Sequence, residues 1–304
     1  LGALLLCATV TLIAFYPILW HNPFEILNAI AYMSHHPWDG DTLVAGRLIG
    51  GSTPYWYIPA WLAVKMPLIT ILGLALTPLA LYKLSRSNVE VNYNKEGDQH
   101  YFQVRALFAL IASTLLILVV LQIKKVALYN ELRQILFIFP ILWISSIACL
   151  FFIKRRVAIT LLSASLVIFI LDNLKLFPYQ YVYFNEIARQ LPISNQYEKD
   201  YFGLSATQGA LWLNHAQLDS QKECLYGSPL HLWQYAIDKE KVSCVKDFSA
   251  RPMQAGGQSY LIGLPVRDKT NGLPIPNCKV IHSEERIAPL STLRLVFNEI
   301  YQCH

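Results

Sequence analysis

The sequence is poor in charge. Only 15% of its 304 residues are Asp, Glu, Lys or Arg, against about 25% in an ordinary soluble domain, and 54% are hydrophobic. This imbalance excludes a disordered chain and argues against a protein that is soluble along its whole length. The charge that is present is uneven, because residues 1–175 hold 13 basic and 8 acidic residues whereas residues 176–304 hold 12 of each. We therefore expect a transmembrane region over 1–175 and a soluble domain over 176–304.

The signatures of several function classes are missing. The chain has no glycine-rich phosphate loop, no Gly-x-Ser-x-Gly motif, no His-Glu-x-x-His motif and no Cys-x-x-Cys pair. Its basic residues do not alternate with aromatic ones in the way that is typical of nucleic-acid-binding surfaces. The segment 35–41 contains two histidines and an Asp-x-Asp, but a polar loop yields such triplets by chance. We predict no metal site, no cofactor and no nucleic-acid partner.

Charge-free runs predict about five transmembrane helices. A helix needs about 20 apolar residues to cross the hydrocarbon core of a membrane. Five runs of 20, 17, 18, 20 and 15 residues contain no charge: Leu1–Trp20, Met66–Tyr82, Ala106–Ile123, Gln134–Ile153 and Val157–Leu171. The second and fifth become longer if Lys65 and Asp172 are accepted within them. Because the chain begins inside an apolar run with no basic leader, we expect it to be the C-terminal part of a longer protein.

The positions of Lys and Arg between these runs predict the orientation, since cytoplasmic loops are rich in both. With alternating spans, segments 83–105 and 154–156 share one side and carry 7 cations. The other side carries 4 cations: Arg47, Lys124, Lys125 and Arg133. The chain is thus expected to be a multi-pass protein of the cell (inner) membrane. Segment 20–55, loop 124–133 and everything after about residue 174 then face outward.

Residues 176–304 have the pattern of a small extracytoplasmic α/β domain. Runs rich in β-branched, aromatic or aliphatic residues predict strands over 223–226, 242–245, 260–264, 279–282 and 293–297. Helical spacing predicts helices over 204–214 and 229–237, the first capped by Ser205. The domain also holds four cysteines, at positions 224, 244, 278 and 303. In an oxidising compartment we expect two disulfides, for which three connectivities are open.

Three cations stand where the predicted spans meet the outer surface. Lys65 lies inside the outward end of the second span, where a charge is costly unless it snorkels or finds a partner. Loop 124–133 adds Lys124 and Arg133 on the side that should be poor in cations. Arg is suited to bidentate contact with phosphate, so Arg133 is the strongest candidate for binding an anionic lipid headgroup. For each of the three, an ordinary surface or snorkelling cation is the alternative.

Short sequence blocks between residues 16 and 214 form an ordered set. They are Tyr16–Pro23, Gly46, Pro54–Leu68, Tyr129–Phe137 with Pro140, Pro178–Glu186, Asp200–Ser205 and Trp212–Asn214. This set resembles membrane glycosyltransferases of the GT-C superfamily and is similar to the dolichyl-phosphate-mannose protein mannosyltransferases (family 39). Each block alone is loose, and Gln134 stands where that family usually has a histidine.

The resemblance implies a mannosyltransferase-like enzyme. Such an enzyme takes a sugar from a polyprenyl-phosphate carrier and passes it, with inversion, to a glycan, lipid or protein acceptor on the outer face. The family's catalytic acid lies in an earlier outward loop, so no catalytic residue is expected in this chain. Tyr129, Tyr179 and Gln180 lie within the blocks and are weaker candidates for substrate contacts.

Two other function classes stay open. A transporter or a transporter-associated subunit would place polar residues at the middle of several spans, whereas the predicted spans have no charge there. A non-catalytic, membrane-anchored subunit whose outward domain binds glycan or peptide is compatible with the absence of the catalytic loop. An acidic residue in an outward loop upstream of Leu1 would favour the enzyme.

The predicted orientation can be tested with cysteines introduced at Ser87 and Asn271. We expect an impermeant thiol reagent added to intact cells to label position 271 and to leave position 87 unlabelled until the membrane is permeabilised, because only the latter faces the cytoplasm. Labelling of position 87 in intact cells would reverse the topology.

Overall fold

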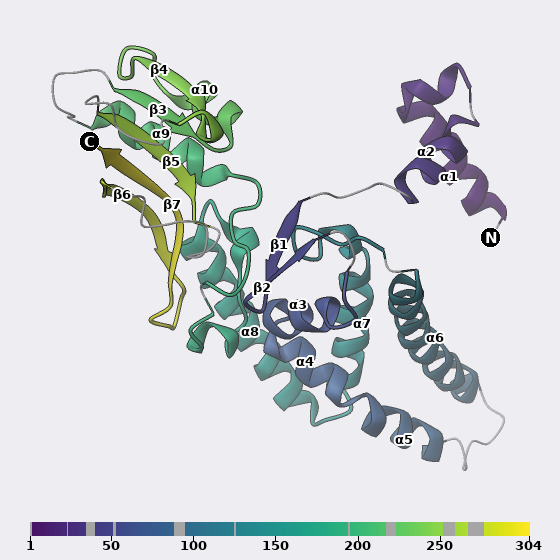
Figure 1. Cartoon of the computed structure of the whole chain (residues 1–304). Helices are drawn as coiled ribbons and strands as arrows, with labels where there is room; N and C mark the ends of the chain where they lie inside the picture. The colour runs from purple at the N-terminus through teal and green to yellow at the C-terminus, as the bar shows by residue number, and fades with distance from the viewer. Residues whose placement is uncertain are drawn as a thin grey trace.

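The computed structural model describes residues 2–22, 24–34, 40–50, 53–87, 95–124, 126–193, 195–216, 223–251, 259–266 and 277–304. A helical N-terminal part is followed by a mixed α/β domain (Figure 1). At the start of the chain, helices α1 (Gly2–Phe15) and α2 (Glu25–Ser34) stand apart from the other helices. The short 3₁₀ turn η1 (Pro17–Trp20) lies between them.

A β-hairpin follows, which the sequence pattern does not predict. Strands β1 (Asp41–Val44) and β2 (Arg47–Gly50) pair antiparallel. Ala45 and Gly46 turn the chain with positive φ angles of 49° and 74°, as two-residue hairpin turns require. A distant segment also holds the hairpin, because the Glu198 N–H donates to the Leu43 carbonyl over 2.9 Å.

The second predicted span is broken by a sharp bend. Helix α3 (Tyr57–Lys65) meets helix α4 (Leu68–Ala75), which continues into α5 (Thr77–Ser87), at an angle of 116°. Pro67 causes the break because it has no N–H to donate and its ring obstructs the preceding turn. Lys65 therefore lies at the end of α3, before the bend, and not within the run that follows it.

The backbone groups around the break at Pro67 are bound by two consecutive residues, Asn185 and Glu186. The Asn185 amide donates to the carbonyls of Ala63 (2.6 Å) and Met66 (3.0 Å), and the Asn185 N–H donates to the Val64 carbonyl (2.8 Å). The Leu68 N–H, at the start of α4, donates to the Glu186 carboxylate over 3.1 Å. Residues nearly 120 positions away in the chain thus complete the bend.

Three more helices complete the N-terminal part: α6 (Lys95–Ile123), α7 (Ile138–Leu150) and α8 (Arg155–Leu176). Among the described residues, the stretch 106–123 of α6 and all of α8 are long and apolar enough to cross a membrane, and the bent helix pair makes a third candidate. The first and fourth predicted spans form helices of only 14 and 13 residues, α1 and α7. They are shorter because 3₁₀ turns, η1 and η2 (Arg133–Ile135), occupy part of each charge-free run.

The C-terminal domain contains a five-stranded mixed sheet with the order β4-β3-β5-β7-β6. The strands are β3 (Cys224–Gly227), β4 (Cys244–Asp247), β5 (Tyr260–Pro265), β6 (Cys278–Ile287) and β7 (Arg294–Cys303). Strand β3 pairs parallel with β4 and β5, and β7 pairs antiparallel with β5 and β6. Helices α9 (Leu204–His215) and α10 (Leu230–Ala236) contact the sheet, and a 3₁₀ turn, η5 (Phe248–Ala250), follows β4. The predicted α/β domain is confirmed.

Two disulfides join neighbouring strands of this sheet. Cys224 is bonded to Cys244 across β3 and β4, and Cys278 is bonded to Cys303 across β6 and β7. The expectation of two bridges is therefore confirmed, and the structure selects one of the three connectivities.

The N-terminus of α9 is capped differently from the prediction. Gly203, with φ of 70°, occupies the N-cap position in place of Ser205. The Asp200 carboxylate accepts the N–H groups of Leu204 and Ser205, each over 3.0 Å. A carboxylate at this end is favourable because it also meets the positive end of the helix dipole.

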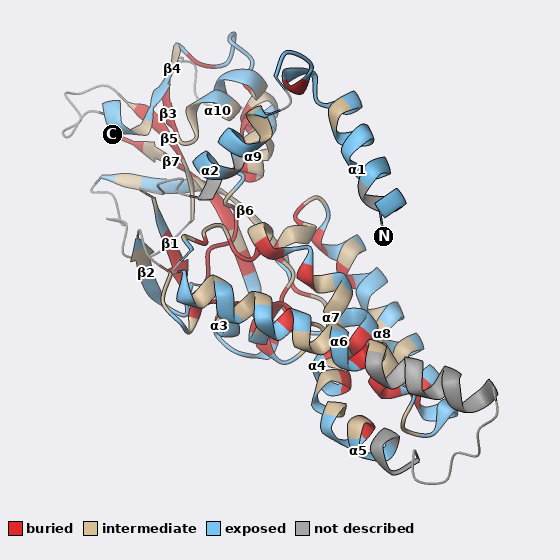
Figure 2. Ribbon diagram, turned by 90° about the vertical axis from the view of Figure 1, so that its right-hand side faces the viewer, coloured by how far each residue is buried: buried red, intermediate tan, exposed pale blue. Residues whose placement is uncertain are grey.

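The α/β domain is tied to the end of α8. Arg189, in the 3₁₀ turn η4 (Ala188–Gln190), forms a bidentate pair with Asp172 of α8 over 2.6 and 2.8 Å. The same guanidinium donates to the carbonyl of Pro289, between β6 and β7. Figure 2 shows buried residues along the sheet and where it approaches the helices, whereas α1 is exposed over most of its surface.

The bend at Pro67 should depend on the Asn185 side chain. Asn185→Ala removes three hydrogen bonds in a residue that is 1% exposed: one to the Ala63 carbonyl of α3, one to the Met66 carbonyl just after it and one from the Ala188 N–H. We expect the free energy of unfolding to fall by about 2–4 kcal/mol, because buried carbonyls lose their partners. Thermal melting in detergent measures this, with the exposed Asn195→Ala as the matched control. Equal melting temperatures for the two variants would contradict the role of Asn185.

Candidate functional site

One cluster of buried side chains joins segments that are far apart in the sequence. It takes residues from α3, from the loop before α7, from the segment after α8 and from β7; among them are Tyr57, Trp61, Leu132, Ile135, Tyr179, Phe184, Tyr197 and Phe297. Three of the sequence blocks, Pro54–Leu68, Tyr129–Phe137 and Pro178–Glu186, therefore meet in one place. Loop 124–133, with its predicted cations, lies at this meeting point.

The loop has an unusual backbone that other parts of the chain hold in place. Asn130 and Glu131 have φ angles of 53° and 66°, in the left-handed region that residues other than glycine rarely adopt. The Thr53 hydroxyl donates to the Val126 carbonyl and accepts the Leu128 N–H, both over 2.7 Å. The segment before α3 thereby fixes the start of the loop.

Glu131 is the most strongly anchored residue of the loop. Its carbonyl accepts the Tyr57 hydroxyl over 2.8 Å, and its carboxylate lies 2.8 Å from the Lys65 ammonium. Lys65 also donates to the Tyr181 carbonyl over 2.9 Å and lies over the rings of Trp61 and Phe184. Burial raises the pKa of the Glu131 carboxyl to about 7, although the nearby Lys65 acts to lower it. Lys65 is thus a buried, paired cation.

Arg133 and Lys124 have different surroundings from Lys65. Arg133 opens η2, is half-buried and places its guanidinium over the Tyr129 ring, 4.9 Å from the ring centre. Lys124 is exposed just after α6. Within the described residues, neither cation forms an ion pair with an acid, whereas Lys65 and Arg189 both do. These two side chains can therefore accept an external anion without losing an internal partner.

Tyr201 lies close to the loop from the side of the α/β domain. Burial raises the pKa of its phenol, the nearby Glu131 raises it further, and Arg133 lowers it. Its ring also meets that of Tyr181, whose hydroxyl donates to Asp200. Arg133 is therefore near a group of aromatic side chains that includes Tyr201, in the segment that leads into α9.

The weaker candidates are separated by the fold. Tyr129 lies against Arg133, at the cationic loop. Tyr179 is fully buried, with its ring stacked on Phe297 and its hydroxyl donating to Glu284 over 3.3 Å. Gln180 opens the 3₁₀ turn η3 (Gln180–Val182) and is half-buried. The contacts of Tyr179 join the α/β domain to the segment after α8.

The sequence reasoning did not identify Glu131, Tyr57 or Thr53. A signal for Glu131 was present, since it is the only acid between residues 99 and 171. An acid isolated among apolar residues and cations invites a search for a buried partner. No comparable signal exists for Tyr57 or Thr53, whose roles depend on contacts with residues more than 70 positions away.

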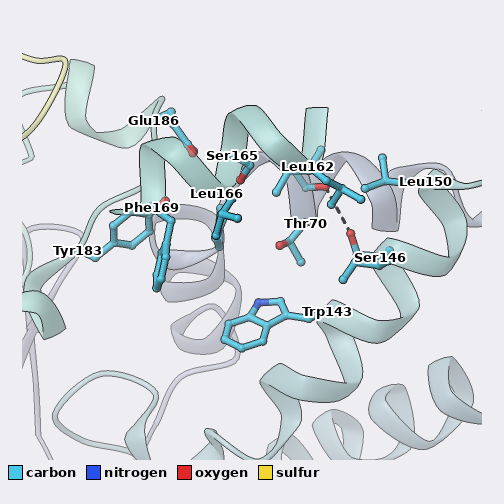
Figure 3. Close-up of a pocket in the computed structure, with 13 residues that line it drawn as sticks. Thr70, Trp143, Ser146, Leu150, Leu162, Ser165, Leu166, Phe169, Tyr183 and Glu186 are labelled. Carbon is cyan, nitrogen blue, oxygen red and sulfur yellow. Dashed lines mark hydrogen bonds between the residues drawn. The ribbon is translucent and has the colours of Figure 1, made fainter. Parts of the chain in front are cut away.

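A cavity of about 280 Å³ lies between α4, α7 and α8. Figure 3 shows the side chains around it, with Trp143, Leu162, Leu166 and Phe169 among the apolar ones. Its polar groups are few: the hydroxyls of Thr70, Ser146, Ser165 and Tyr183, and the Glu186 carboxylate. Such an apolar lining suits a hydrocarbon chain better than a sugar.

Metal binding has no structural support in the described part of the chain, where no group of three His, Cys, Asp or Glu side chains could hold an ion. Residues 35–39, with the two histidines, lie outside the described residues. Comparison with protein-family models found no match, and neither did comparison with curated proteins or with solved structures.

Proposed function

We propose that this chain is part of a membrane glycosyltransferase that moves a sugar, as a mannosyltransferase does, from a polyprenyl-phosphate carrier to an acceptor on the outer face. The observation that carries this proposal is the contrast between the cations of the site. Lys65 is buried and neutralised by Glu131, whereas Arg133 and Lys124 have no acidic partner among the described residues and lie on a loop that is held in place.

In this proposal the chain crosses the inner membrane five times within residues 1–175, and residues 176–304 lie outside the cytoplasm. In this arrangement α1 and α7 cross together with the turns next to them. Loop 124–133 then sits at the outer headgroup level, where a lipid-linked phosphate also lies. The apolar cavity between α4, α7 and α8 offers space for part of a prenyl chain.

Each candidate residue has a distinct part in this proposal. Arg133 holds the carrier phosphate in two parallel charge-assisted hydrogen bonds, and Lys124 adds a second positive charge. Tyr129 orients the guanidinium through its ring. Lys65 acts on the loop through Glu131. Tyr179 and Gln180 support the site from the segment after α8. No catalytic residue of this chain is assigned.

The proposal predicts a large effect of Arg133→Ala. As the sugar leaves, the carrier phosphate gains charge, so losing one preorganised cation should cost roughly 2–4 kcal/mol of transition-state stabilisation. Transfer from polyprenyl-phosphate mannose by the full-length protein should fall by about two to three decades. Arg133→Lys should recover only part of it, because an ammonium cannot form the bidentate contact.

The matched control is Arg155→Ala, which removes an exposed cation at the start of α8. It should leave transfer and melting temperature close to those of the native protein, because an exposed cation contributes little to folding. Near-native transfer by a well-expressed Arg133→Ala variant would refute the phosphate-binding role. If the native protein transferred no sugar but bound a glycan or peptide, the anchored binding subunit would be the better description.

A further inference from the structure

Glu131 differs from every other ionisable residue of loop 124–133, because it is acidic and 8% exposed. A buried carboxylate is costly unless it is paired and hydrogen-bonded. Replacing a buried ion pair by apolar residues is often neutral for stability or even favourable. The Lys65–Glu131 pair therefore needs an explanation other than folding energy.

The backbone of the loop supplies that explanation. Two consecutive non-glycine residues, Asn130 and Glu131, hold left-handed conformations, which are unfavourable for residues with a Cβ unless other contacts support them. Two contacts supply this support: the ion pair between the Glu131 carboxylate and Lys65, and the hydrogen bond that the Glu131 carbonyl accepts from the Tyr57 hydroxyl. The chain enters η2 at Arg133 only two residues later.

We infer that Glu131 is a positioning residue, which fixes the place of the Arg133 guanidinium by pairing with Lys65. This inference rests on the proposed function for the identity of the anion. The effect of Glu131 on the loop does not depend on that function. Lys65 and Tyr57 both belong to α3, whose end is fixed by Asn185. The position of Arg133 is thus fixed relative to the bent helix pair.

The test measures loop order and anion binding in the full-length protein in detergent. Hydrogen exchange of peptides covering residues 126–135 reports the loop. Binding of farnesyl phosphate, with farnesol as the uncharged control ligand, reports the phosphate contact. The variants are Glu131→Gln, Lys65→Met and Thr53→Val, with the exposed Glu240→Gln as the matched acid-to-amide control.

Glu131→Gln should increase exchange across 126–135 and weaken farnesyl phosphate binding about tenfold, with farnesol unaffected. Lys65→Met should have the same two effects. Thr53→Val should also have them, because it removes the other anchor of the loop. It keeps the test possible if the charge variants fold poorly. Glu240→Gln should change neither readout. In an Arg133→Ala background, Glu131→Gln should cause no further loss of farnesyl phosphate binding, because a residue that acts through Arg133 has nothing left to position.

Two outcomes would overturn the inference: unchanged exchange in both Glu131→Gln and Thr53→Val, or an equal loss of farnesyl phosphate binding whether or not Arg133 is present. Failure of the proposed function looks different. In that case Arg133→Ala binds farnesyl phosphate as the native protein does, and the exchange data alone decide whether Glu131 orders the loop.

Discussion

The structure depends on how the chain satisfies the backbone groups exposed by Pro67. In an apolar environment an unpaired carbonyl or N–H has no water to bind, so a helix break there needs partners from elsewhere. Asn185 and Glu186 provide them. Because the bend is fixed in this way, α3 lies against the segment after α8 and presents Tyr57 and Lys65 to the loop that carries Arg133. The anchoring of Glu131 by Tyr57 and Lys65 follows from that placement.

Pairing with an acid distinguishes the structural cations from the candidate functional one. Inside the fold, Arg189 is paired with Asp172 and Lys65 with Glu131, as the cost of burying single charges requires. Arg133 is only half-buried, rests on an aromatic ring and forms no ion pair within the described residues. A cation that the fold holds in place but does not neutralise is available to an external anion, and this distinction underlies the proposed phosphate contact.

Local sequence patterns predicted the helices, strands and disulfides that depend mainly on nearby residues. Charge-free runs located α6 and α8, and runs rich in β-branched, aromatic or aliphatic residues located the five strands described in the α/β domain. Cysteine content in a domain predicted to face outward indicated two bridges. The pattern of charge also selected Lys65, Lys124 and Arg133. It did not reveal the partner of Lys65, the bend after it or the hairpin β1–β2, because each depends on contacts between residues about 65 to more than 150 positions apart. Periodicity carries no information about such pairings.

The disulfides supply an argument on orientation that is independent of counting cations. Bridges persist in oxidising compartments, so the bonded sheet is consistent with a location outside the cytoplasm. That sheet contacts the segment after α8 through Phe297 on Tyr179, and the connection between β6 and β7 contacts it through the Pro289 carbonyl, which accepts from Arg189. The same segment binds Lys65, which binds Glu131 of the cationic loop. These contacts join the disulfide-bonded sheet to the loop that carries Arg133, so the proposed orientation places both on the same side of the membrane.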